Sequence, residues 1–415
     1  FRAAIWLRGL RFKLQDEATV PKAVLVRLDA CLAVARVYSV TDPLLGAYFQ
    51  ARLLLLALRF GEPFRLIYAL CLEGAYRSVS GVNARARADE SFERAAEVIR
   101  ASGNERASKA LVPSTRGFAA VVQGRWHEGL ALSDQGSATI QKMGAGMYWA
   151  LRQTQLNGLW ALGGLGHLGE LSSRLARNVD EALACGDTWT VTTLRTSWMF
   201  ALGWLRDHDP DQIRGWIDAG MRGWTDRAYH NQHWFACTGL VLLDLWEGRG
   251  RDAFDRIERE MPLARRALKF KMEVVRVEAR MFRARAALMA ASEAGGPERR
   301  RFVDVAARDA RWLRRAGPDY ATSATALVEA SIADLRGDRG RCVAALEEAV
   351  RHADETSQRL VGAVARIRLG TVRAAQRPED GRELIEAGVA FMRAEGVRDA
   401  GRMTAVFCPA RDPQG

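Results

Sequence analysis

The sequence predicts an all-α fold in which helical hairpins stack side by side as an α-solenoid. A helix-breaking turn of the form Gly-Arg/Asp-x-x-x-small recurs at Gly81, Gly124, Gly166, Asp207, Gly248, Gly295, Gly337 and Pro378. The successive spacings are 43, 42, 41, 41, 47, 42 and 41 residues, with amphipathic sequence between the turns. Such a period, with a helix breaker in every repeat, is typical of stacked helical hairpins. No alternation of apolar and polar residues lasts beyond a few positions, so no β-strand is expected.

Each repeat is expected to place a first helix before its turn and a second helix after it. The expected first helices are residues 105–123, 146–165, 187–206, 230–247, 271–291, 318–336 and 358–376. The expected second helices are residues 84–102, 126–143, 169–185, 210–224, 251–268, 297–316, 339–357 and 379–395. In the segment 339–357, for example, Val343, Leu346 and Val350 recur at helical spacing. Such a stripe marks the buried side of an amphipathic helix.

Residues that end and begin helices lie between the hairpins. Gly103, the stretch 144–146, Gly186 and the pair 317–318 are expected to separate consecutive hairpins, because glycine and proline end helices. Asp187 and Asp209 are expected to be N-caps, because their carboxylates can accept hydrogen bonds from the first free backbone N–H groups.

The two ends depart from the repeat. Residues 1–60 contain two apolar helical stretches, 22–38 and 44–60, which we expect to cap the array or to couple it to an upstream domain. The repeat array is predicted to occupy residues 61–408. Periodicity is lost after Gly396, and the tail that follows it is expected to be frayed. Residues 409–415 are expected to be a C-terminal tail outside the array. Because the chain starts at Phe1 with helix-like sequence, we expect it to be part of a longer protein.

The composition predicts a folded protein and disfavours nucleic acid as a partner, and no membrane is expected. Hydrophobic residues make up 48% of the chain and charged residues 27%, which argues against disorder. The net charge of +12 comes almost wholly from arginine, with acidic residues interleaved throughout. Even the densest basic segment, 299–315, carries Asp304 and Asp309, so it is expected to be a solvated helix face. The alternative is that it binds an anionic partner or nucleic acid.

The cysteines and apolar runs predict a cytoplasmic location. The six cysteines are far apart, with no C-x-x-C pair, which fits free and mostly buried thiols in a reducing compartment. No signal peptide is visible, and the longest apolar run, 53–58, is too short to cross a bilayer.

Several segments resemble one bacterial family. They are GLRFKLQDEATVPKAVLVRLDACLAVA, GAYFQARLLLLALRFGEP, the LRT within 187–206, HNQHWF at 230–235 and the terminal GVAFMRAEGVRDAGRMTAVF. They are similar to the C-terminal region of large serine/threonine protein kinases, in which a kinase domain and an AAA-type ATPase module precede tetratricopeptide-like repeats. The resemblance spans essentially the whole chain and implies about eight tetratricopeptide-like hairpins in a right-handed superhelix.

The resemblance implies a regulatory role without catalysis in this chain. The kinase signatures and the G-x-x-x-x-G-K-[ST] phosphate loop are absent from the sequence. We therefore expect a non-catalytic scaffold that binds a protein or peptide, including the upstream ATPase or kinase domains of the same polypeptide. No cofactor is expected. The hairpins are about eight residues longer than a standard tetratricopeptide unit, so the peptide-clamp residues of that family cannot be transferred.

Three other classes of function remain open. The chain could be the ligand-sensing superhelix of a signal-transduction ATPase, although no helix-turn-helix follows the array. It could also be a stand-alone adaptor solenoid. Helical hairpins of this length also build closed α/α toroids that hydrolyse glycosides, but here no loop carries two carboxylates with aromatic platforms.

Two groups of residues resemble metal sites only in part. His230 and His233 are spaced so that one helix could bring both imidazoles to a metal, but no third ligand is near. The carboxylates in Asp207–Asp211 resemble the start of a calcium loop, but Pro210 interrupts it and no glutamate lies at the twelfth position. We expect helix capping at both places and no metal.

Tryptophans on three consecutive first helices suggest a recognition groove. Each lies beside arginine, amide, hydroxyl or imidazole side chains, and the candidate groove residues are Trp149, Arg152, Gln155, Trp189, Thr192, Arg195, Asn231, His233 and Trp234. Aromatic, guanidinium and amide groups at equivalent heights would suit an extended peptide or an acidic segment. The alternative is that these tryptophans fill the space between neighbouring hairpins.

Overall fold

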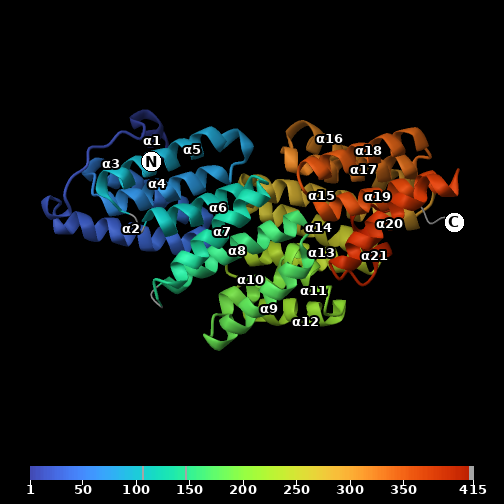
Figure 1. The fold of residues 1–415 in the computed structure, drawn as a ribbon, viewed down its shortest axis with the longest axis horizontal. Coiled ribbons are helices and arrows are strands. Elements are labelled where there is room, and N and C mark those ends of the chain that lie inside the picture. The colour runs from blue at the N-terminus through green and yellow to red at the C-terminus, as the bar shows by residue number, and fades with distance from the viewer. Residues whose placement is uncertain (105–106, 145–146, 411–415) are drawn as a thin grey trace. The chain divides into compact units, whose positions relative to one another are not determined.

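The protein is all-helical, as the sequence predicts. The computed structural model describes residues 1–104, 107–144 and 147–410, and in these segments it contains 21 α-helices and no β-strand (Figure 1). The chain divides into two compact units. Unit 1 comprises residues 1–161 and 271–274, and unit 2 comprises residues 162–270 and 275–415.

Unit 1 begins with the segments that precede the first repeat. Its helices are α1 (Arg2–Arg8), α2 (Lys22–Thr41), α3 (Pro43–Phe60), α4 (Pro63–Ser78), α5 (Arg85–Ser102), α6 (Val112–Val122) and α7 (Trp126–Gln141). A π-helical turn, Ala107–Leu111, leads into α6, and α8 (Tyr148–Leu165) crosses into unit 2. The core that the helices at the start of the chain form is leucine-rich, and Leu53, Leu54 and Leu66 are completely buried in it.

Unit 2 continues the alternation of helices. Its helices are α9 (Leu168–Ala184), α10 (Thr188–Thr196), α11 (Trp198–Trp204), α12 (Pro210–Arg222), α13 (Asn231–Trp246), α14 (Gly250–Arg266), α15 (Glu273–Glu293), α16 (Gly296–Ala316), α17 (Thr322–Leu335), α18 (Arg339–Glu355), α19 (Arg359–Ala374), α20 (Pro378–Ala394) and α21 (Ala400–Phe407). The first two residues of α15 belong to unit 1.

Helices pack mainly against their neighbours in the chain. The pairs α4 with α5, α6 with α7, α13 with α14, α17 with α18, and α19 with α20 form antiparallel hairpins, as Figure 1 shows for the last two. Consecutive hairpins also contact one another in several places, for example through α18 and α19. Sequential packing of this kind is consistent with an α-solenoid. The repeat number of about eight and the right-handed sense stay predictions.

The turn glycines share one backbone conformation. Gly124, Gly166, Gly248 and Gly337, the four strongest copies of the turn motif, have φ angles of 75°, 81°, 75° and 77°. Only glycine adopts this left-handed region without strain, and it does so readily at the end of a helix. The motif therefore recurs because each hairpin turns its chain in the same way.

The expected helix 187–206 is instead two helices, which corrects the prediction. Ser197 is extended, with ψ of 141°, and separates α10 from α11. The break leaves the Leu194 carbonyl free to accept a hydrogen bond of 2.9 Å from the Trp204 indole. The sequence contains no proline or glycine at this point, so the break follows from packing and not from local helix propensity.

The segment after Gly396 is not frayed through Cys408, which corrects a second prediction. Asp399 caps α21 by accepting a 2.8 Å hydrogen bond from the backbone N–H of Arg402. Met403, Val406 and Phe407 are buried. Of the expected tail at 409–415, residues 411–415 lie outside the described residues.

The two expected N-caps behave differently. Asp187 accepts a 3.0 Å hydrogen bond from the Thr190 backbone N–H, so its capping role is confirmed. Asp209 occupies the N-cap position of α12 but makes no capping hydrogen bond there, so that prediction is wrong. Its carboxylate forms an ion pair with Arg398 at 3.0 Å instead.

Two expectations about the whole chain can be compared with the described residues. All six cysteines are free, and five of them are buried. None of the helices in the described segments combines the length and the apolar character that a bilayer crossing requires.

Candidate functional site

The main candidate surface is the side of unit 2 against which α21 packs. α21 contacts α13, α17 and α19, which are first helices, and α20, which precedes it in the chain. The guanidinium of Arg285 on α15 also lies 4.4 Å from the ring centre of Phe407 in α21. We call the surface formed by α13, α15, α17 and α19 beneath α21 the first-helix face.

Apolar side chains hold α21 on the first-helix face. Met403 and Phe407 retain 1% and 3% of their surface exposed, and Val406 retains none. Two polar contacts follow at its end: the Cys408 thiol lies 3.3 Å from the Ser331 hydroxyl, and Arg368 Nε donates to the Cys408 carbonyl at 2.9 Å. The face therefore binds a short amphipathic helix within the same chain.

The loop before α21 is held by polar contacts far from it in sequence. Glu395 accepts a 3.0 Å hydrogen bond from the backbone N–H of Gly169. Arg398 donates from Nε to the Arg206 carbonyl at 2.8 Å and pairs with Asp209 through Nη1. These contacts join residues near the end of unit 2 to residues near its beginning, about 190 to 230 positions earlier in the chain.

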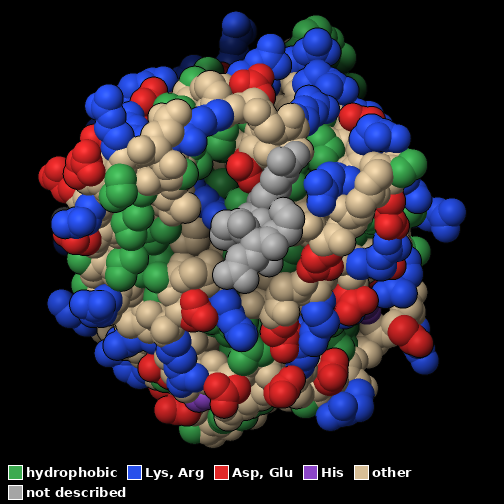
Figure 2. All heavy atoms as spheres, turned by 90° about the vertical axis from the view of Figure 1, so that its right-hand side faces the viewer, with side chains coloured by type: hydrophobic (Ala, Val, Ile, Leu, Met, Phe, Trp, Pro, Cys, Tyr) green, Lys and Arg blue, Asp and Glu red, His purple; other side chains and the backbone are tan. Residues whose placement is uncertain are grey.

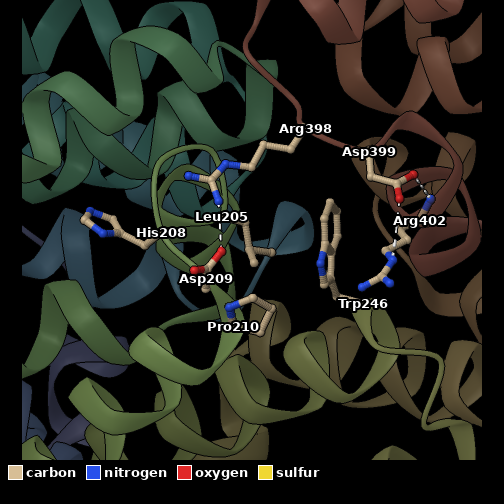
Figure 3. A pocket seen from close by; sticks show the side chains of 8 residues that line it. All are labelled: Leu205, His208, Asp209, Pro210, Trp246, Arg398, Asp399 and Arg402. Atoms are coloured by element: carbon tan, nitrogen blue, oxygen red, sulfur yellow. Dashed lines mark hydrogen bonds and ion pairs between the residues drawn. The ribbon is translucent and has the colours of Figure 1, made fainter.

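A pocket of about 200 Å³ opens beside this loop (Figure 3). Trp246, Pro210 and Leu205 supply apolar wall, while Arg398 and Arg402 bring positive charge. Both arginines already face a carboxylate, Asp209 for Arg398 and Asp399 for Arg402 (Figure 3). Ligand pockets usually have volumes of about 300–1,000 Å³. The small volume and the paired charges give little support to a small-molecule site here.

Arg285 differs from the other buried charged residues in the described chain. It retains 3% of its surface exposed and has no hydrogen bond or ion pair to a described residue, and its Nε atom is buried. By contrast, Asp309 is bonded to Arg280 and Arg283, and Asp244 to three arginines including Arg214. Burial lowers the pKa of Arg285 to about 9, so it still carries its charge near neutral pH.

The first-helix side of unit 2 also contains a partly buried carboxylate. Glu278 on α15 accepts hydrogen bonds from the indole N–H groups of Trp198, at 2.8 Å, and Trp234, at 2.9 Å. Burial raises the pKa of Glu278, although both hydrogen bonds act in the opposite direction. The carboxylate therefore joins α11, α13 and α15 through the indoles of Trp198 and Trp234.

Replacing Glu278 with alanine is expected to lower the free energy of unfolding by about 2 kcal/mol, because two largely buried indole donors lose their acceptor. Glu278→Gln keeps one acceptor oxygen and is expected to cost less. Glu293→Ala on the same helix is the control, since Glu293 is exposed. Urea unfolding followed by circular dichroism measures all three; equal losses for Glu278→Ala and Glu293→Ala would contradict the assigned role.

The predicted groove residues are divided between the two units. Trp149, Arg152 and Gln155 lie on α8 within unit 1. Arg152 is buried and donates a hydrogen bond from Nη1 to Gln155 Oε1 at 3.0 Å. The central carbon of its guanidinium lies 4.9 Å from the ring centre of Tyr148. Trp149 and Gln155 are partly exposed.

The other six predicted residues lie in unit 2, on α10 and α13. Thr192 and Trp234 are buried, with 6% and 1% of their surface exposed. Their role in a groove stays a prediction. Trp234 lies in the core and donates a hydrogen bond to Glu278. A large ring buried between helices removes more apolar surface from water than an exposed ring does. Trp189 and Arg195 are partly exposed, and Arg195 stacks on Trp216 at 4.9 Å.

Asn231 and His233 stabilise the start of α13. Asn231 accepts a 2.8 Å hydrogen bond from Lys269, and the His230 backbone N–H donates to His233 Nδ1 at 3.0 Å. Mainly through burial, the pKa of His233 is lowered, which keeps this acceptor nitrogen neutral. The capping role predicted for the histidines is confirmed, and the described residues contain no cluster of three metal-ligating side chains.

Acidic partners neutralise much of the positive charge. Arg314 in the basic segment of α16 pairs with Glu329 and with Glu348, the latter at 2.6 Å. On the face drawn in Figure 2, Lys and Arg side chains alternate with Asp and Glu side chains, without a broad basic patch. This distribution agrees with a solvated surface better than with a phosphate-binding one.

Comparisons with known proteins add no family. No family model matches the chain, and no significant match exists among curated proteins. Sequence reasoning missed Arg285 and α21. A charge at an apolar position of a helix was the available signal for Arg285, which is flanked by Ala284 and Ala286 and lies seven residues after Glu278.

Proposed function

We propose that the chain is a non-catalytic scaffold for protein interaction, acting as the regulatory C-terminal arm of a bacterial serine/threonine kinase. The observation that supports this proposal most is the packing of α21: the first-helix face of unit 2 binds an amphipathic helix. Grooves of this kind bind partner helices through apolar residues at helical spacing. The kinase connection rests on the sequence resemblance.

The arrangement favours binding over chemistry. The conspicuous polar groups, such as Glu278, Asp244 and Asp309, are used in contacts between helices. A partner bound to the first-helix face would alter how neighbouring hairpins pack, because each hairpin is stabilised chiefly by the next. That change would pass along the array to the domains joined to it.

The kinase connection can be tested in the full polypeptide that contains this chain. Phosphorylation of a generic substrate and of the kinase itself should be compared between that polypeptide and a version lacking residues 61–408. We expect the deletion to change the rate, in either direction, while the kinase domain remains folded. An unchanged rate and an unchanged response to cellular partners would refute a regulatory arm.

A further inference from the structure

α21 is held on the first-helix face mainly by apolar contact. Isolated helices shorter than about 12–15 residues are marginal in water, and α21 has only 8. The ion pair of Arg398 and Asp209 beside it is largely exposed, with 47% and 81% of the two side chains accessible, while Arg368 and Ser331 contact Cys408 at its end. Exposed ion pairs contribute little to stability. α21 is thus folded because the face beneath it is apolar.

Within the described residues, Arg285 has neither a hydrogen bond nor an ion pair to a carboxylate beneath α21. Among the described residues, the Cys408 thiol is the titratable group that interacts with the Arg285 charge, and burial raises the pKa of this thiol, so it is neutral near pH 7. Phe407 covers the guanidinium with its ring, which is a weaker partner than a carboxylate. Leaving a buried cation unpaired is costly, so the fit of α21 to this face is incomplete.

We propose that α21 is a displaceable occupant of the first-helix face and that the face binds an amphipathic helix of a partner protein carrying a carboxylate where α21 has Cys408. The proposal rests on the scaffold function and specifies the partner. The partner helix presents apolar side chains at the positions of Met403, Val406 and Phe407. Its carboxylate forms a forked, charge-assisted pair with Arg285, which gives it the advantage over α21.

The charge pattern of the site favours an acidic helix. Arg368 lies on the same side, with its Nε bound to the Cys408 carbonyl, so two guanidinium groups lie near this end of α21, together with the carboxylate of Asp334. Phe407 and Cys408 are adjacent to Arg285. The carboxylate of the partner helix must therefore follow its last apolar residue directly, at the position that corresponds to Cys408. A helix lacking the acid would gain nothing over α21 and would replace it less readily.

Two labelled peptides of residues 398–410 test this, one with Glu and one with Gln at position 408. Their binding to the full 415-residue chain is measured by fluorescence anisotropy. We expect the Glu peptide to bind about tenfold more tightly, as one charge-assisted hydrogen bond allows. Hydrogen exchange of the chain's own amides at 400–408 should accelerate when that peptide binds, because α21 is released.

Variants of the chain test whether the preference for the Glu peptide depends on Arg285. Arg285→Gln should abolish the preference for Glu, and Arg285→Lys, which keeps the charge without the fork, should reduce it. Arg308→Gln on α16 is the control, since Arg308 is exposed, and should keep the full preference. Equal binding of the two peptides, no binding of either, or binding without faster exchange at 400–408 would overturn the proposal.

The peptide experiment and the kinase experiment fail independently. Peptide exchange involves only this chain, so it can succeed although deletion of residues 61–408 leaves kinase activity unchanged. In that case the face is a binding site outside kinase regulation. If the deletion changes kinase activity but α21 is not displaced, the regulatory role stands and this inference falls.

Discussion

Replacing Asp309 with alanine is expected to lower the free energy of unfolding by about 3 kcal/mol, because two guanidinium groups then lose their shared carboxylate. Asp309 on α16 is completely buried and accepts hydrogen bonds from Arg280, at 3.0 Å, and from Arg283, at 2.7 and 2.6 Å. The two arginines lie on α15, so the carboxylate joins α15 to α16. Both arginine side chains are about a quarter exposed, at 25% and 22%, which keeps the expected loss at the lower end for a buried ion pair.

Asp304→Ala provides the matched control for Asp309→Ala. Asp304 lies on the same helix and pairs with Arg336 at 3.4 Å, but the two side chains are 63% and 49% exposed. Its removal is expected to cost less than about 1 kcal/mol. Asp309→Asn, which keeps an acceptor but loses the charge, should fall between the two. Urea unfolding by circular dichroism gives the three values; equal losses for Asp309→Ala and Asp304→Ala would contradict the assigned role of Asp309.

The regular part of the fold was accessible from sequence because its causes are local. A left-handed glycine ends a first helix in each strong repeat, and the helices on either side carry their own apolar stripe. The second helix expected at 339–357, for example, is α18 at Arg339–Glu355. Neither inference needs knowledge of which helix lies opposite.

The features that were missed depend on residues distant in the chain. α21 is too short to give a periodic pattern, and it is helical because it packs on α13, α17 and α19. Arg285 is unusual only because Phe407, 122 residues later, covers it without neutralising it. Among the predicted groove residues, the sequence left open whether Trp234 faces a partner or the core, and its burial and its indole hydrogen bond to Glu278 depend on α15, more than 40 residues later.

Gly239 and Gly215 show the same limit, because both are glycines inside predicted helices and only the structure separates them. A Cβ at Gly239 in α13 would lie 2.1 Å from the Thr196 carbonyl oxygen, at the end of α10 where the chain breaks at Ser197. A Cβ at Gly215 in α12 would meet nothing within 4 Å. The close approach of α13 and α10 therefore requires glycine at 239 and leaves position 215 unconstrained.

We expect Gly239→Ala to destabilise the protein by about 2 kcal/mol or more, since a backbone carbonyl cannot move aside as a side chain can. Intrinsic helix propensity alone would favour alanine at both positions by up to about 1 kcal/mol. Gly215→Ala should therefore stabilise the protein by roughly that amount. Opposite signs in urea unfolding would show that the contact with Thr196 dominates at position 239. A stabilised Gly239→Ala variant would mean that α10 and α13 do not approach each other this closely.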